Sequence, residues 1–110
     1  MGRRLCVVFQ PHRYSRTQLL WDDFGQCFPN ADLLFLTEIY PAGEAPIDGV
    51  SSELIRDAVK KHEGREVTII RKFEEIPDAV MPNLTAGDIV LTLGAGDIYK
   101  AGRRILERLK

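Results

Sequence analysis

Three side chains that carry or can acquire positive charge lie within five positions of one another, at His12, Arg13 and Arg16. They follow the apolar run 4–9, which has the composition of a buried strand, and they precede a helical pattern. Free N–H groups and the dipole at the start of a helix favour an anion, and each guanidinium is a planar fork that fits a carboxylate or phosphate. The segment 11–16 therefore predicts an anion-binding loop, with Arg13 and Arg16 as its ligands.

A solvated basic loop would have the same composition. However, ligands of open α/β sheets bind beyond the carboxyl ends of the strands, where this loop is expected to lie. His12 is explained as well by a structural hydrogen-bonding role as by a catalytic one. Ser15 is a suitable N-cap, and Gln18 completes a capping-box pattern three residues later. We therefore expect a helix from about 16 to 28.

Two further segments could contribute to a site. Gly94, Gly96 and Asp97 follow an apolar run, and glycines there permit a tight turn and the close approach of a ligand. Their G-x-G spacing is only part of the dinucleotide fingerprint, and a tight turn with Asp97 as N-cap explains them equally well. In the loop 40–49, Glu44 could bind a substrate amine or a partner domain, although a rigid solvated connector explains that loop slightly better.

Apolar runs alternate with helical patterns along the whole chain. The expected strands are 4–9, 31–39, 67–70 and 88–93, and the expected helices are 16–28, Ser51 or Ser52 to Gly64, 73–81, and the residues after 97. Such alternation implies right-handed crossovers and a mainly parallel sheet. We therefore expect a single α/β domain, a Rossmann-like three-layer arrangement in which helices cover both faces of the apolar strands.

Composition limits the classes of function. A net charge of −1 without a clustered basic surface argues against nucleic-acid binding. No apolar stretch approaches the roughly 20 residues that span a membrane, so we expect a cytoplasmic protein without a membrane partner. Cys6 and Cys27 form no metal or redox motif, and both are predicted to be buried free thiols. The sequence also lacks a phosphate-binding loop and a nucleophile elbow, which leaves anion recognition without a complete catalytic apparatus.

The segment 8–17, Val-Phe-Gln-Pro-His-Arg-Tyr-Ser-Arg-Thr, resembles the bacterial Mur ligases. The segments 40–47, Tyr-Pro-Ala-Gly-Glu-Ala-Pro-Ile, and 94–98, Gly-Ala-Gly-Asp-Ile, are similar to the same family. Enzymes of this family have a UDP-binding domain, a central ATPase domain and a C-terminal domain that recruits the amino acid. The resemblance identifies residues 1–110 as most of that C-terminal domain. Its first strand-helix unit, which carries an Asp-Asp-Tyr-Gly-His-His-Pro string in the family, is expected to be missing.

The resemblance is strongest to the branch of the family that joins L-alanine to UDP-N-acetylmuramate in peptidoglycan synthesis, using ATP and Mg²⁺. It implies that Arg13 and Arg16 bind the carboxylate of L-alanine. It also implies that His12, Tyr14 and Ser15 support their loop. The possible contacts in the cleft between domains are then Glu44, Gly94, Gly96 and Asp97.

The resemblance also implies what this chain does not do alone. ATP, Mg²⁺ and UDP-N-acetylmuramate would be bound by the UDP-binding and central ATPase domains, which become the partners of residues 1–110. We therefore expect no catalytic residue, no metal ligand, no ligase activity and only weak L-alanine binding in this chain by itself. From the residues alone, a stand-alone α/β module that binds a small anionic ligand or a protein partner is the alternative.

Overall fold

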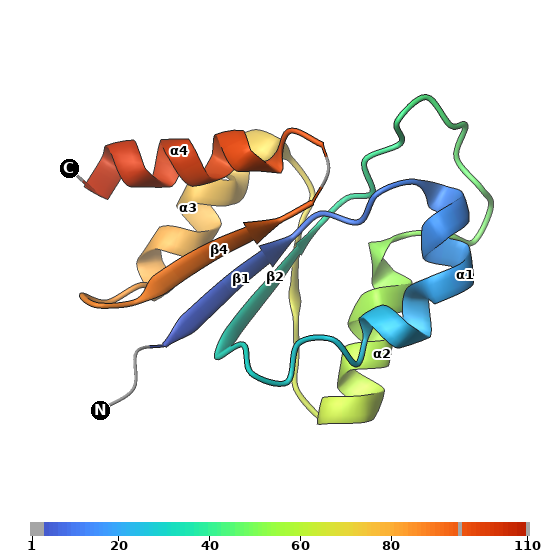
Figure 1. Ribbon diagram of the computed structural model, residues 1–110, viewed down its shortest axis with the longest axis horizontal. Coiled ribbons are helices and arrows are strands. Elements are labelled where there is room, and N and C mark those ends of the chain that lie inside the picture. Colours follow the sequence, from blue (N-terminus) through green and yellow to red (C-terminus); the bar gives the residue numbers. More distant parts are fainter. Residues whose placement is uncertain (1–3, 95, 110) are drawn as a thin grey trace.

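The computed structural model describes residues 4–94 and 96–109, and these residues form one four-stranded sheet. The strands are β1 (Leu5–Phe9), β2 (Leu33–Thr37), β3 (Thr68–Ile70) and β4 (Ile89–Leu93). They lie in the order β3-β2-β1-β4, and every neighbouring pair is parallel (Figure 1). The carboxyl ends of all four strands therefore share one edge of the sheet, with the end of β1 near its middle.

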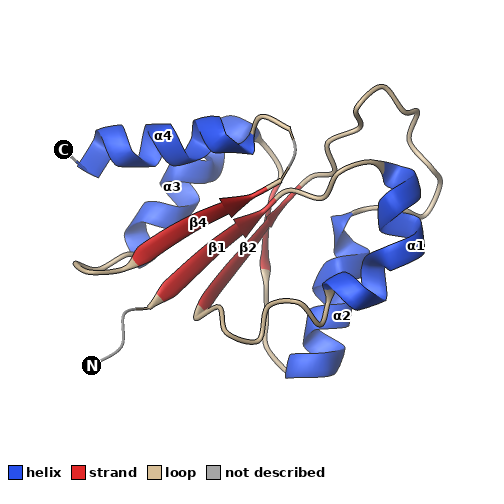
Figure 2. Cartoon of the chain, viewed as in Figure 1, coloured by secondary structure: helices blue, strands red, loops and turns tan. Residues whose placement is uncertain are grey.

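Helices cover both faces of the sheet (Figure 2). They are α1 (Tyr14–Phe24), α2 (Ser52–Glu63), α3 (Ile76–Val80) and α4 (Ile98–Leu109), with the 3₁₀ turns η1 (Phe73–Glu75) and η2 (Met81–Asn83) flanking α3. α1 and α2 lie on one face, and α3 and α4 lie on the other. None of these helices within the described residues is long and apolar enough to cross a membrane. The arrangement confirms the predicted Rossmann-like three-layer α/β fold.

The side chains of β1 alternate between two separate cores. Cys6 and Val8 pack with α3 and α4, whereas Val7 packs with α2 and with Phe28. All three β1 side chains are at most 2% exposed. The run 4–9 therefore forms a strand that is buried on both faces, as its continuous apolar composition predicts.

The predicted ends of the second helix are confirmed. The side chain of Ser51 caps α2 by accepting a hydrogen bond of 3.2 Å from the N–H of Glu53. Gly64 ends the helix in the left-handed conformation, with φ of +70°. The predicted helix 73–81 is divided into η1, α3 and the start of η2, and Pro77 lies in the first turn of α3. A proline is tolerated there because the N–H that it lacks has no partner within the helix.

The first helix differs from its predicted bounds. It begins at Tyr14, two residues earlier than expected, and ends at Phe24, four residues earlier. Arg13 occupies the N-cap position and makes no capping hydrogen bond with its side chain, while Ser15 lies inside the first turn. The predicted Ser15 N-cap and its capping box are therefore wrong. The helix stops early because Phe28 turns back into the core, where it is 8% exposed.

The strand β4 is less covered than the sequence predicts. Its side chains Ile89 and Leu91 are 46% and 43% exposed, although both are large and apolar. In the described residues this strand pairs only with β1, so its other edge is open. Helices thus lie on both faces of the sheet, as predicted, but in the described residues they leave these two side chains of β4 partly uncovered.

Candidate functional site

The predicted anion-binding loop is held against the end of β2. The N–H of Tyr40 donates to the carbonyl oxygen of Pro11, and the N–H of Arg13 donates to the carbonyl oxygen of Tyr40, both at 2.8 Å. These bonds extend the parallel pairing of β1 and β2 by one bridge, between His12 and Tyr40. The rings of His12 and Tyr40 also stack, with centroids 5.9 Å apart and planes 12° apart. The structure therefore pairs His12 with Tyr40 through both backbone and ring.

The backbone of Arg13 is strained. Its φ is +70° and its ψ is 142°, a region that residues with a Cβ rarely adopt. Its carbonyl oxygen accepts hydrogen bonds from the N–H and the hydroxyl of Thr17, at 3.2 Å and 3.0 Å. Thr17 is fully buried, so this anchor is rigid. A conformation of this kind costs about 1–3 kcal/mol and persists only where the surroundings enforce it, which is typical of ligand-binding positions.

The guanidinium groups of Arg13 and Arg16 are exposed and free. Within residues 4–94 and 96–109, none of the ion pairs or side-chain hydrogen bonds includes either group. The exposed Arg103, by contrast, lies over the ring of Tyr99 at 5.5 Å. The structure thus places Arg13 and Arg16 at the start of α1, beyond the carboxyl end of β1, and neither guanidinium takes part in an ion pair within the described residues.

The carboxylate of Glu44 binds at the N-terminus of α1. Its carboxylate accepts a hydrogen bond of 3.1 Å from the N–H of Ser15 and one of 2.5 Å from the hydroxyl of Ser15. The hydroxyl contact, followed by the N–H contact, lowers the pKa of Glu44 below its ordinary value. The carboxylate is thus kept negative at neutral pH, and the exposed N–H of the first turn of α1 already has an anion. The N–H of Ser15 is therefore already paired, and it is not open to a further anion.

The turn after β4 lies against the same loop. The amide of Gln10 donates to the carboxylate of Asp97 at 3.2 Å, and Gln10 is only 6% exposed. A Cβ on Gly96 would lie 2.7 Å from the ring of Tyr40 and 2.8 Å from the side-chain oxygen of Gln10. Gly94 has φ of +156°, which suits glycine. Gln10 was not predicted as a site residue, although a polar residue directly after a buried strand is a usable signal.

Three segments therefore meet at this edge: 10–16, 40–44, and Gly94 with 96–97. Residue 95, which belongs to the predicted Gly94–Asp97 turn, lies outside the described residues. In the described part of the chain, no three His, Cys, Asp or Glu side chains are close enough to hold a metal ion. Exposed guanidinium groups at a helix start are an arrangement that can bind and orient an anion.

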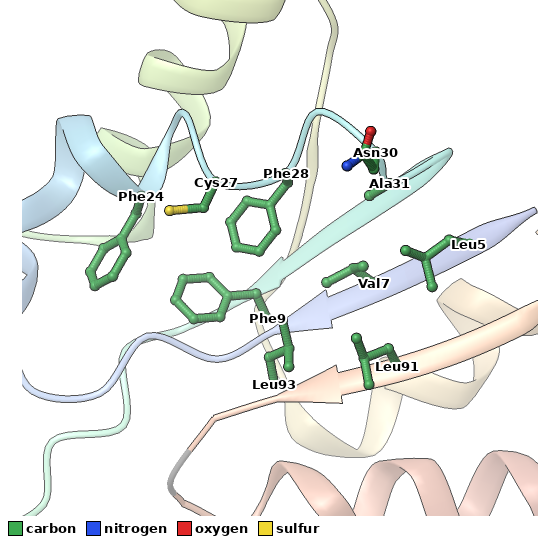
Figure 3. A pocket seen from close by; sticks show the side chains of 10 residues that line it. All are labelled: Leu5, Val7, Phe9, Phe24, Cys27, Phe28, Asn30, Ala31, Leu91 and Leu93. Atoms are coloured by element: carbon green, nitrogen blue, oxygen red, sulfur yellow. The ribbon is translucent and has the colours of Figure 1, made fainter.

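A separate apolar groove of about 370 Å³ lies on the α1 and α2 face of the sheet, beside β4 (Figure 3). It is lined by Leu5, Val7, Phe9, Phe24, Cys27, Phe28, Asn30, Ala31, Leu91 and Leu93. Cys27 is exposed, so its predicted burial is wrong. Cys6 is buried as predicted, and burial raises the pKa of its thiol to about 11. The lining carries no charge, so the groove is not an anion site.

Comparison with known proteins identifies the family. Residues 1–96 match the model of the family described as Mur ligase, glutamate ligase domain. The chain is 51% identical over 108 residues to UDP-N-acetylmuramate–L-alanine ligase of Geobacter sulfurreducens, and 48% identical over 109 residues to the enzyme of the same name from Myxococcus xanthus. These alignments cover 98% and 99% of this chain, and 23% of each relative. The chain thus spans about a quarter of the length of these relatives.

A solved structure shows the same fold. The crystal structure of UDP-N-acetylmuramate-alanine ligase from Thermotoga maritima matches with a TM-score of 0.74 at 28% sequence identity. The match covers 98% of this chain and 20% of that chain. The family model covers more than half of the chain, and the sequence relatives and the structural relative agree with it. The chain therefore belongs to the Mur ligase family and carries its glutamate ligase domain.

Proposed function

We propose that this chain is the amino-acid-recruiting C-terminal domain of a UDP-N-acetylmuramate–L-alanine ligase, and that Arg13 and Arg16 bind the carboxylate of L-alanine. The observation that carries the proposal is the pair of free guanidinium groups at the carboxyl edge of the sheet, on a loop whose backbone is held in a strained conformation. The names of the relatives supply the substrate: L-alanine brings a carboxylate, which is the anion that these forks fit.

The domain would contribute to the reaction by positioning L-alanine. In the proposed ligase, the neutral amine of L-alanine attacks the carbonyl carbon of an acyl phosphate formed from UDP-N-acetylmuramate and ATP. A C–N bond forms, the C–O bond to phosphate breaks with its electrons leaving on the phosphate, and the nitrogen gives up one proton, which the phosphate or solvent takes. If Arg13 and Arg16 both bind the carboxylate of L-alanine, the direction of the L-alanine amine is fixed. This lowers the entropic part of the activation barrier. The anchored loop suits this task, because Thr17 and Tyr40 hold Arg13 before the ligand arrives.

The described residues do not fit ATP or Mg²⁺. They contain no cluster that could hold a metal ion, and the turn at Gly94 and Gly96 lacks the lysine and hydroxyl of a phosphate-binding loop. We assign ATP and Mg²⁺ to the central ATPase domain and UDP-N-acetylmuramate to the UDP-binding domain of the full-length ligase. Because the reaction consumes ATP and a UDP-sugar, we expect it to take place in the cytoplasm.

We further propose that, in the full-length ligase, a further strand-helix unit of the longer protein covers the apolar groove. The chain moves from β1 towards β2 through α1, which lies on the groove face. A helix that came from a strand beyond β4 and led into β1 would move in the same direction. Because such crossovers are right-handed, that helix would lie on the same face, over Leu91 and Leu93. The exposure of β4 supports this proposal.

The main proposal is tested by steady-state kinetics of the full-length ligase. Arg13→Ala and Arg16→Ala should each raise the KM for L-alanine by about 10- to 100-fold, the range expected when one charge-assisted contact is lost. The KM values for ATP and UDP-N-acetylmuramate should stay within about twofold of wild type. Arg103→Ala, which removes an exposed arginine away from the loop, is the matched control and should leave all three unchanged. An unchanged KM for L-alanine in both loop variants would refute the assignment.

A further inference from the structure

We propose that Glu44 is a positioning residue for L-alanine binding: its carboxylate holds the first turn of α1, and thereby the adjoining Arg13, in the ligand-binding geometry. The inference rests on the proposed function of Arg13 and Arg16. It assigns to Glu44 a task inside the protein, distinct from a direct contact with a substrate amine or with another domain.

The contact itself is built to fix α1. Both oxygens of Glu44 are used: one accepts from the N–H of Ser15 at 3.1 Å and the other from its hydroxyl at 2.5 Å. These residues are 29 positions apart, so the contact ties the loop 40–49 to the start of α1. Arg13, at the N-cap position, makes no capping hydrogen bond with its side chain. Glu44 therefore supplies from a distance the anion that a capping side chain normally provides.

A strained turn directs Glu44 to this place. Ala42 and Gly43 have φ of +51° and +88°, and the N–H of Glu44 donates to the carbonyl oxygen of Pro41 at 3.0 Å. Two successive positive φ values with this hydrogen bond describe a tight reversal, in which alanine is an unfavourable residue. The turn brings the side chain of Glu44 back towards α1.

The strained positions lie on the two sides of this contact. In the described part of the chain, Arg13 and Ala42 are the non-glycine residues with positive φ. Arg13 lies two residues before Ser15, and Ala42 lies two residues before Glu44. Strain persists where several contacts enforce it, and it concentrates at ligand sites. The Ser15–Glu44 contact, together with the anchors at Tyr40 and Thr17, supplies that enforcement.

The contact also leaves the arginines free for the ligand. The carboxylate of Glu44 satisfies donors of the first turn of α1, and it makes no ion pair with Arg13 or Arg16 in the described residues. Its pKa is lowered mainly by the hydroxyl and N–H of Ser15, and in smaller part by the positive charge of Arg13. An incoming carboxylate is therefore directed to the guanidinium forks, which determine its orientation better than a helix terminus does.

The test uses the full-length ligase with Glu44→Ala, Ser15→Ala and the double variant. Glu44→Ala should raise the KM for L-alanine about tenfold, since a charge-assisted contact is lost, while kcat stays within about twofold. Ser15→Ala should raise the same KM by a smaller factor. If the two residues act through one contact, the double variant should be no worse than Glu44→Ala alone. Glu66→Ala removes an exposed glutamate that pairs with Lys60 at 3.1 Å, and as control it should change nothing.

The outcomes separate this inference from the proposed function. If Arg13→Ala raises the KM for L-alanine and Glu44→Ala does not, the arginine site stands and the role of Glu44 is wrong. A lower KM in Glu44→Ala would also overturn the inference, because Glu44 would then compete with the ligand. If the variant only destabilised the domain, the active fraction and hence kcat would fall while the KM for L-alanine stayed constant. An unchanged KM in Arg13→Ala would refute the proposed function itself.

Discussion

The N–H of Arg13 donates a hydrogen bond of 2.8 Å to the carbonyl oxygen of Tyr40, and this bond joins the predicted anion-binding loop to the segment beyond the end of β2. Because the carbonyl oxygen of Arg13 is held by Thr17 as well, both sides of this residue are fixed. The φ of +70° is the consequence, and it places a bulky side chain where glycine would be more stable. Binding geometry and stability therefore make opposite demands at this position.

Arg13→Gly should consequently be more stable than Arg13→Ala in the 110-residue chain. Both variants lose the side chain, but only glycine relieves strain of about 1–3 kcal/mol. The greater entropy of glycine in the unfolded chain offsets about 0.5–1 kcal/mol of that gain. We expect a free energy of unfolding about 1 kcal/mol higher for the glycine variant, measured by urea denaturation. Equal stability of the two variants would show that this backbone is not strained.

The fold could be predicted because each element has a local cause. Continuous apolar runs produced strands, and Ser51 and Gly64 marked the two ends of α2 correctly. Because the strands alternate with helices, only a few sheet topologies were possible. The sequence could not predict the exposure of β4, because apolar composition reports a capacity for burial and not whether the covering element is present.

The site was predicted only in part, because its geometry depends on residues distant in sequence. The place of Arg13 and Arg16 after β1 was predicted from residue type and position, and their ligand-binding role stays a prediction. The start of α1 was not predicted correctly, because the residue that caps its first turn is Glu44, 29 positions beyond Ser15. Local capping rules pointed to Ser15 instead, because a hydroxyl before an apolar helical pattern has the same signature.

Gly96→Ala should destabilise the domain by about 1–3 kcal/mol, the usual effect of overpacking. The new Cβ would lie 2.7 Å from the ring of Tyr40, which stacks on His12, and 2.8 Å from the side-chain oxygen of Gln10. The ring would have to move, so the loop should be disturbed as well. The measurement is the free energy of unfolding of wild type and of Gly96→Ala, determined by urea denaturation.

Gly102→Ala is the matched control for that variant. Gly102 lies within α4, and its new Cβ would make its nearest contact, 3.4 Å, with the methyl group of Thr92. Alanine is the better helix former, so this variant should gain about 0.5–1 kcal/mol. A Gly96→Ala protein as stable as Gly102→Ala would contradict the close packing of the turn against Tyr40.

The Arg4–Asp88 contact should make stability depend on acid pH. Arg4 donates to both oxygens of Asp88, at 2.7 Å and 3.2 Å, and the N–H of Thr85 donates at 2.8 Å. The Arg4 contact, followed by that of Thr85, lowers the pKa of Asp88 from 3.8 to about 2. Because the folded pKa is the lower one, the contact stabilises the fold above pH 3.8, and this stability is lost as the pH falls towards about 2.

Asp88→Asn tests this dependence. The free energy of unfolding of wild type should exceed that of the variant at pH 7, and the difference should shrink as the pH falls from about 4 to about 2. The measurement is urea denaturation at a series of pH values. Asp48→Asn, at an exposed carboxylate without an ion pair in the described residues, serves as control and should show no such pH-dependent difference. A constant difference for Asp88→Asn at all pH values would contradict the lowered pKa of Asp88.

The two cysteines should differ strongly in their reaction with an aromatic disulfide reagent. Cys27 is exposed beside the apolar groove, so in the native 110-residue chain one thiol should react rapidly. Cys6 is 1% exposed and its thiol pKa is raised to about 11 by burial, so it should react only when the chain unfolds. Cys27→Ser should abolish the rapid phase and leave the slow one.

The same reaction tests the proposed cover of the groove. In the full-length ligase, a helix over Leu91 and Leu93 would also shield Cys27, since all three residues line the groove (Figure 3). The rapid phase should therefore slow by about tenfold or more, because the thiol is reached only through local opening. The phase that disappears in the Cys27→Ser variant of the full-length ligase is the reaction of Cys27. Equal rates in the full-length ligase and in the 110-residue chain would mean that no part of the longer protein covers this face, and that the exposed edge of β4 belongs to the native surface.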